Sequence, residues 1–162
     1  MIHALCNAGP IARIARVGHP PFEEGDAIEI TFASGAVFYI DVGLEHATDI
    51  RVGEGTLLEA AYGHLRTEEP DTFAAIARDW SSGDLDLPWL IGATLSRPRR
   101  LTMTHPYRVE VGYVFDAAGK GFALFGEADL IFAAALDDPD IAGFELAVGA
   151  PPELRRPPYS AA

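Results

Sequence analysis

The chain has 162 residues, of which 49% are hydrophobic and 22% are charged, a composition that can bury a full core and argues against global disorder. Its 24 acidic and 12 basic residues give a net charge of −12, which disfavours nucleic-acid binding because phosphate backbones are repelled. The single cysteine, Cys6, excludes a disulfide within the chain, and the longest apolar stretch, 130–136, is too short for a membrane helix.

The first ten residues contain no basic segment followed by an apolar run, so the sequence predicts no secretory signal and a cytoplasmic protein. The basic residues are almost all arginine, and alanine and glycine are abundant, which is typical of a GC-rich bacterial genome. We expect one α+β domain over 1–150, followed by an extended, Pro-rich C-terminal tail over 151–162.

The N-terminal residues around His3 and Cys6 are interpreted as an ordinary strand, and 11–17 as the next one. The consecutive prolines that follow 11–17 cannot donate to a sheet, so they end this strand. A further short strand is predicted over 47–52, beside the hairpin described next.

Alternating apolar residues over 28–42 predict a β-hairpin with two alternative registers. A two-residue turn would place Asp41 on the apolar face. A three-residue loop, with Gly35 in the left-handed conformation, pairs Ile28 with Ile40 and leaves one face entirely apolar. We predict the second register, because the buried face determines how strands align.

Two sequential helices are predicted over about 56–66 and 70–80. Thr56 and Glu59 have the spacing of a capping box, in which each side chain binds a free amide of the first turn. Pro70 suits the first position of the second helix, because proline lacks the amide hydrogen that would be unpaired there.

The second half of the chain is predicted to form strands, with a turn at 137–140. The expected strands cover 89–95, 99–104, 107–115, 122–132 and 143–148. Strands that flank two sequential helices differ from the alternating pattern of a parallel sheet. We therefore predict an α+β fold with a mainly antiparallel sheet, curved or split, and both helices packed on one of its faces.

No motif for metal, cofactor or nucleophilic chemistry is complete. His3 and Cys6 are three residues apart, but zinc needs a second pair of ligands, so we expect no metal. Gly53 and Gly55 lie between a predicted strand and helix without the third glycine of a dinucleotide-binding loop, and we expect no cofactor. No serine lies in a G-x-S-x-G elbow, and the sequence as a whole favours a non-enzymatic role.

The excess negative charge lies in one segment, 22–86, which holds 15 acidic and 3 basic residues, whereas the remainder is balanced. We expect this segment to dock a basic protein partner and not nucleic acid or a membrane. Size, acidity and the lack of a catalytic motif are typical of immunity or inhibitor-type proteins. The predicted partner-binding residues are Glu23, Glu24, Asp26, Glu45, Asp49, Glu54, Glu68, Glu69 and Asp71.

Two alternatives remain open. In the first alternative, the protein is a small-ligand-binding protein or an enzyme. Its site then lies in a sheet concavity, where Glu127 and Asp129 share a strand face. The residues predicted for that site are Trp89, Tyr107, Glu110, Tyr113, Glu127 and Asp129. The other alternative is a subunit of a larger assembly. We also expect the arginines of 97–100 to form salt bridges with the acidic segment.

Overall fold

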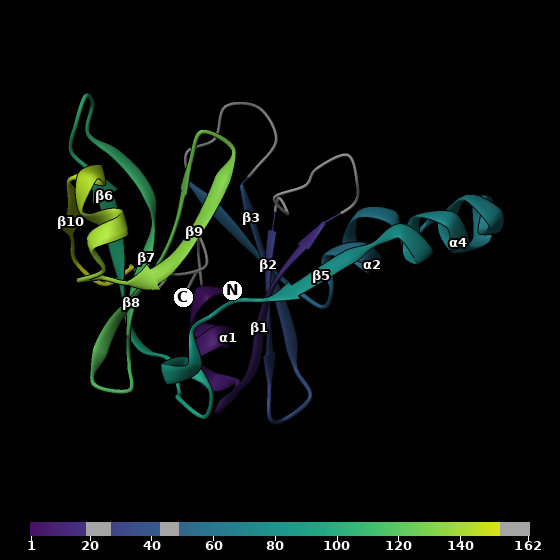
Figure 1. Cartoon of the computed structure of the whole chain (residues 1–162), viewed down its shortest axis with the longest axis horizontal. Coiled ribbons are helices and arrows are strands. Elements are labelled where there is room, and N and C mark those ends of the chain that lie inside the picture. The colour runs from purple at the N-terminus through teal and green to yellow at the C-terminus, as the bar shows by residue number, and fades with distance from the viewer. Residues whose placement is uncertain (19–26, 43–48, 153–162) are drawn as a thin grey trace, which may run out of the picture.

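A computed structural model describes residues 1–18, 27–42 and 49–152 of the chain (Figure 1). Two five-stranded antiparallel sheets form its centre, so the α+β class and the antiparallel pairing are confirmed, and the sheet is split in two. Within the described residues, no helix has both the length and the apolar character needed to span a membrane.

The first sheet has the strand order β4-β3-β2-β1-β5. Its strands are β1 (Ile11–Gly18), β2 (Ala27–Phe32), β3 (Val37–Val42), β4 (Ile50–Glu54) and β5 (Ser81–Asp84). The last strand returns to the sheet after the helical segment and pairs with β1.

The second sheet has the strand order β10-β6-β7-β8-β9. Its strands are β6 (Ser96–Met103), β7 (Val109–Ala117), β8 (Lys120–Glu127), β9 (Leu130–Ala135) and β10 (Leu146–Val148). Strands β6 to β9 follow one another as a meander, and β10 completes the edge next to β6.

The main core joins the two sheets. It contains Ile14 and Ile30 from the first sheet together with Phe115 and Leu124 from the second, all at most 2% exposed. Burial of these large apolar side chains is the main force holding the sheets together.

Helix α1 (Ile2–Asn7) replaces the strand expected at the N-terminus. Ile2 and Leu5 are three residues apart, so they share one helix face, and both are buried in the main core. The expectation of a strand was wrong. A six-residue helix with two buried residues is too short to show a helical period of apolar residues in the sequence.

The hairpin of β2 and β3 has the register predicted from the sequence. Ile28 pairs with Ile40 and Ile30 with Phe38, and Gly35 has a φ of +88°. The expected third strand is β4, which begins at Ile50.

The helical segment consists of α2 (Leu57–Tyr62), α3 (Leu65–Glu68) and α4 (Pro70–Asp79). Thr56 caps α2, where its hydroxyl accepts a hydrogen bond from the Glu59 amide at 3.3 Å. Pro70 occupies the first turn of α4, as predicted. The other half of the capping box is replaced, because the Glu59 carboxylate binds Arg66 instead.

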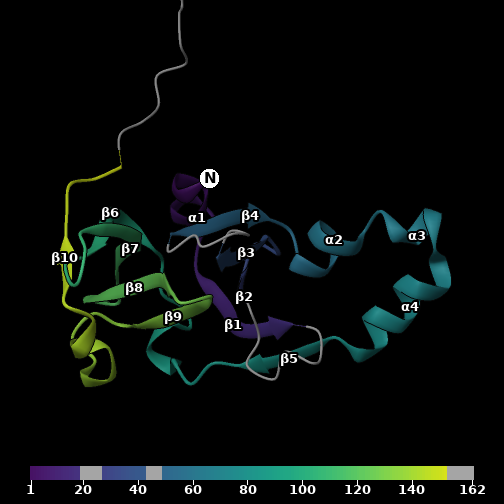
Figure 2. The same cartoon turned by 90° about the horizontal axis from the view of Figure 1, so that it is seen from above.

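These helices form an arm that extends from the first sheet, away from the second (Figure 2). Leu57 and Trp80, at the two ends of the arm, pack against a small cluster that includes Ala15 and Val17 of β1. The expected packing of both helices across a sheet face is therefore limited to these ends. Within the arm, Tyr62 and Trp80 form an edge-on aromatic pair with their ring centroids 6.2 Å apart.

Three expectations for the second half are corrected. Instead of a strand over 89–95, the chain forms the 3₁₀ helix η1 (Pro88–Leu90), which Pro88 begins. The strand expected over 122–132 is two strands, because Ala128 and Asp129 have positive φ values of 48° and 67° and reverse the chain. The first part of 143–148 belongs to η2 (Pro139–Phe144), and only β10 is extended.

Candidate functional site

The predicted partner-binding acids do not share one environment. Glu23, Glu24, Asp26 and Glu45 lie outside the described residues. Asp49 precedes β4 and Glu54 is its last residue. Glu68, Glu69 and Asp71 instead lie at the junction of α3 and α4, at the outer end of the arm (Figure 2).

The α3–α4 junction concentrates exposed negative charge. Glu68, Glu69 and Asp71 are all exposed. Among the residues that the structure describes, no basic side chain lies within ion-pair distance of them. Glu69 is the N-cap residue of α4, and Asp71 lies in its first turn. Negative charge is stabilised there by the helix dipole, so the local fold favours acids at this tip. The Thr72 hydroxyl also donates to the Glu69 carboxylate at 3.0 Å.

Other acids of segment 22–86 are neutralised by nearby arginines. The carboxylates of Asp41, Glu59 and Asp79 bind Arg51, Arg66 and Arg78, and Asp84 binds Arg13 of β1. The hydrogen bond to Asp41, against a smaller effect of burial, raises the pKa of Arg51. Among the described acids of this segment without an ion pair, Glu68, Glu69 and Asp71 lie together on the arm, whereas the others are single residues elsewhere in the fold.

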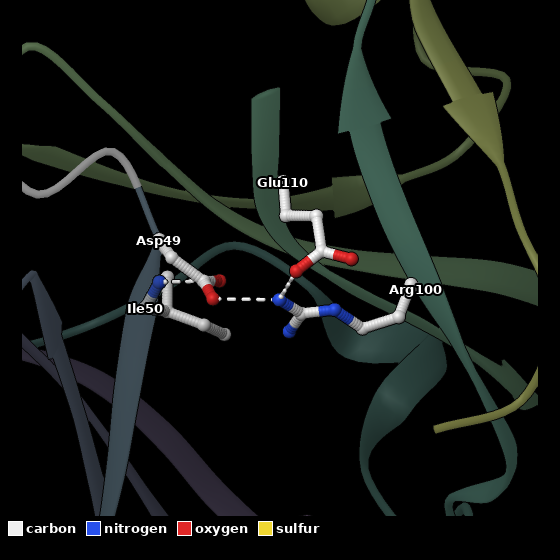
Figure 3. A network of polar contacts seen from close by, with 4 residues as sticks. All are labelled: Asp49, Ile50, Arg100 and Glu110. Atoms are coloured by element: carbon white, nitrogen blue, oxygen red, sulfur yellow. Dashed lines mark hydrogen bonds and ion pairs between the residues drawn. The ribbon is translucent and has the colours of Figure 1, made fainter. Parts of the chain in front are cut away.

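Arg100 of β6 pairs with two carboxylates from different sheets (Figure 3). Its guanidinium donates to Asp49, which precedes β4, at 2.7 Å and to Glu110 of β7 at 2.5 Å. The same group lies over the Tyr113 ring, 4.5 Å from its centroid. The predicted salt bridge between 97–100 and the acidic segment is thus confirmed for Arg100 and Asp49.

These contacts change the ionisation of the cluster. Burial alone would lower the pKa of Arg100, but the hydrogen bonds to Glu110 and Asp49 outweigh it and raise that pKa above its ordinary value. The hydrogen bond and the charge of Arg100 in turn lower the pKa of Glu110. The lowered pKa keeps Glu110 ionised at neutral pH, and the ion pairs of Arg100 connect the two sheets.

A cleft of about 390 Å³ lies beside this cluster. It contains two residues predicted for the ligand site, Glu110 and Tyr113. The complete lining is Arg100, Thr102, Arg108, Glu110, Tyr113, Gly149, Ala150, Pro151 and Pro152. Because Arg100 already binds two carboxylates, its charge is satisfied within the protein.

The other residues predicted for the ligand site lie apart from this cleft. Trp89 packs edge-on against Phe122 in the main core, with their ring centroids 6.1 Å apart. Tyr107 is 80% exposed. Glu127 ends β8 and Asp129 lies in the following turn, so they do not share the strand face expected for an acid–base pair.

Within 1–18, 27–42 and 49–152, no group of three or more His, Cys, Asp or Glu side chains is placed to hold a metal ion. Cys6 lies on α1, and burial raises the pKa of its thiol. A raised pKa keeps the thiol protonated at neutral pH, which makes it a weak nucleophile.

No protein-family model, no curated protein and no solved structure matches this chain. A functional proposal therefore depends on the chemistry of its own surface.

Proposed function

We propose that this protein is a non-enzymatic docking module, of the immunity or inhibitor type, whose acidic arm binds a basic surface of a partner protein. The observation that supports it is the charge at the α3–α4 junction. Glu68, Glu69 and Asp71 are exposed there and lack an ion-pair partner among the described residues, whereas most neighbouring acids have one.

The position of the arm suits this role for a physical reason. Carboxylates on a segment that extends from the sheets can reach a partner without the bulk of the molecule intervening (Figure 2). Their field attracts positive charge over about one Debye length, roughly 8 Å at physiological salt. Such attraction mainly raises the association rate.

The test is capture from a native-host lysate followed by binding kinetics. The double variant E68K/E69K reverses two arm charges, and D137K/E145K makes the same change at exposed positions near η2. We expect the wild type and the control to retain one basic protein at low salt and release it at about 0.5 M salt. The arm variant should associate about tenfold more slowly.

Circular dichroism of each variant establishes that it is folded before binding is compared. A partner that binds the arm variant and the wild type at the same rate would exclude docking through this arm. An acidic protein captured with no dependence on salt would have the same consequence.

A further inference from the structure

A second cleft, distinct from the arm and from the Arg100 cluster, opens between the two sheets. Its volume is about 300 Å³, and its lining residues are Arg16, Leu130, Ile131 and Phe132. Strand β9 supplies the three apolar residues and contacts β2 and β3 of the opposite sheet. The cleft therefore lies where the edge strand of the second sheet crosses the first.

Arg16 occupies a position on β1 that faces the core. Successive residues of a strand point to opposite faces, and Ile14, two positions earlier, is buried in the main core. Ala15 and Val17 belong to the small cluster on the other face. Arg16 thus points between the sheets, and its side chain is half-buried where the apolar pattern would place a hydrophobic residue.

The neighbours of Arg16 leave room beside it. Its direct cross-strand partners are Ile28 on β2 and Gly83 on β5. A Cβ atom added at Gly83 would have no other atom within 4 Å. Ile28 is therefore an apolar neighbour of Arg16 on β2, whereas Gly83 on β5 has no side chain that could cover it.

The charge of Arg16 is also unusual in this acidic chain. Seven other arginines form ion pairs: Arg13, Arg51, Arg66, Arg78, Arg97, Arg99 and Arg100. Within the described residues Arg16 has no such partner, which it shares with the exposed Arg108. A carboxylate bound in the cleft would supply the counter-charge that Arg16 lacks among the described residues.

We propose that this cleft binds a monocarboxylate with a short hydrocarbon chain. The carboxylate accepts two parallel hydrogen bonds from the Arg16 guanidinium, and the hydrocarbon lies against Leu130, Ile131 and Phe132. One guanidinium matches a single negative charge, and the apolar remainder of the lining disfavours strongly hydrated ions such as phosphate. The small volume selects a short chain, because ligand pockets start near 300 Å³.

The test uses octanoate as the probe and follows backbone NMR resonances of the full chain. We expect saturable shifts centred on Arg16 and on 130–132, and binding at least tenfold weaker for octanol and for inorganic phosphate. R16Q should weaken octanoate binding about tenfold or more, because the bidentate contact is lost. R108Q removes the charge of an exposed arginine outside the cleft and should bind octanoate as the wild type does.

L130W, which fills the cleft mouth with a larger side chain, gives a second comparison that keeps the charge of Arg16. L130W should abolish octanoate binding. If R16Q does not fold, this variant and the comparison with octanol test the proposed site in its place. Octanoate shifts scattered over the surface, or equal binding by a folded R16Q, would overturn the proposal. E68K/E69K should bind octanoate normally, so this site and the docking arm are tested separately.

Discussion

Arg100 shows how one residue links parts of the chain that are far apart in sequence. Its partners Asp49 and Glu110 lie 51 and 10 residues away, and the cation packs on the ring of Tyr113. The Arg100 side chain is 18% exposed, whereas that of Glu110 is 61% exposed. Water therefore screens the Glu110 contact, and its contribution to stability is about 1 kcal/mol or less.

The contact between Arg100 and Glu110 makes the stability of the folded protein depend on pH. Because Arg100 lowers the pKa of Glu110 below 4.5 in the folded state, the contact stabilises the protein fully above that pH. The stabilisation is lost as the pH falls through the folded-state pKa. We expect the difference in unfolding free energy between the wild type and E110Q to be constant from pH 7 to about 5 and to shrink below it.

Urea unfolding at a series of pH values measures this difference. Glu54 is exposed and has no ion pair among the described residues, so E54Q is the matched control and should show no such decline. A difference for E110Q that grows as the pH falls would contradict the assigned direction of the Glu110 pKa.

At the scale of elements, the pairing of β7 with β8 depends on a close backbone approach. Gly112 pairs with Phe125, and a Cβ atom at Gly112 would lie 2.0 Å from the Leu124 carbonyl oxygen. That oxygen belongs to the backbone of a central strand, so it cannot move without disturbing the sheet. The position consequently requires glycine for space and not for a positive φ.

G112A is therefore expected to destabilise the protein by about 3 kcal/mol, through overpacking at the centre of the second sheet. The control is G143A in η2, where an added Cβ would meet nothing within 4 Å. Thermal and chemical denaturation of both variants measure the difference. A G112A protein as stable as G143A would show that β7 and β8 can separate at no cost.

Elements with strong local signals were predicted from the sequence. The hairpin register followed from the requirement that Asp41 leave the apolar face, and the start of α4 followed from Pro70. The turn at Ala128 and Asp129 was missed because neither residue is glycine, and the apolar run resumes directly after it at Leu130. Helix α1 was missed because its two core contacts are long-range.

At the scale of the whole molecule, charge and core are separated. The exposure of the acids at the α3–α4 junction follows from the sequence, since charged side chains are seldom buried without a partner. The two arginine sites were not predictable in this way. Arg100 and Arg16 depend on which strands of opposite sheets meet, and nothing in the local sequence around them specifies that contact.

This separation predicts a gradient of local stability. The main core draws on both sheets and on α1 but contains no residue of α2, α3 or α4, and Phe73 is the buried residue of the arm. The Arg66 guanidinium covers the Phe73 ring, 4.3 Å from its centroid. Phe73 is therefore covered by a residue of the arm itself. Local opening of the arm therefore exposes little of the main core.

We expect amide hydrogens of α3 and α4 to exchange with solvent at least about 100-fold faster than those of β7 and β8 under native conditions. Hydrogen–deuterium exchange followed by mass spectrometry measures both regions in one sample. F73A should speed exchange in the arm and leave β7 and β8 unchanged, because Phe73 lies outside the main core. Equal protection of arm and sheets would mean that the arm unfolds only with the whole protein, and the arm would then be part of one cooperative unit.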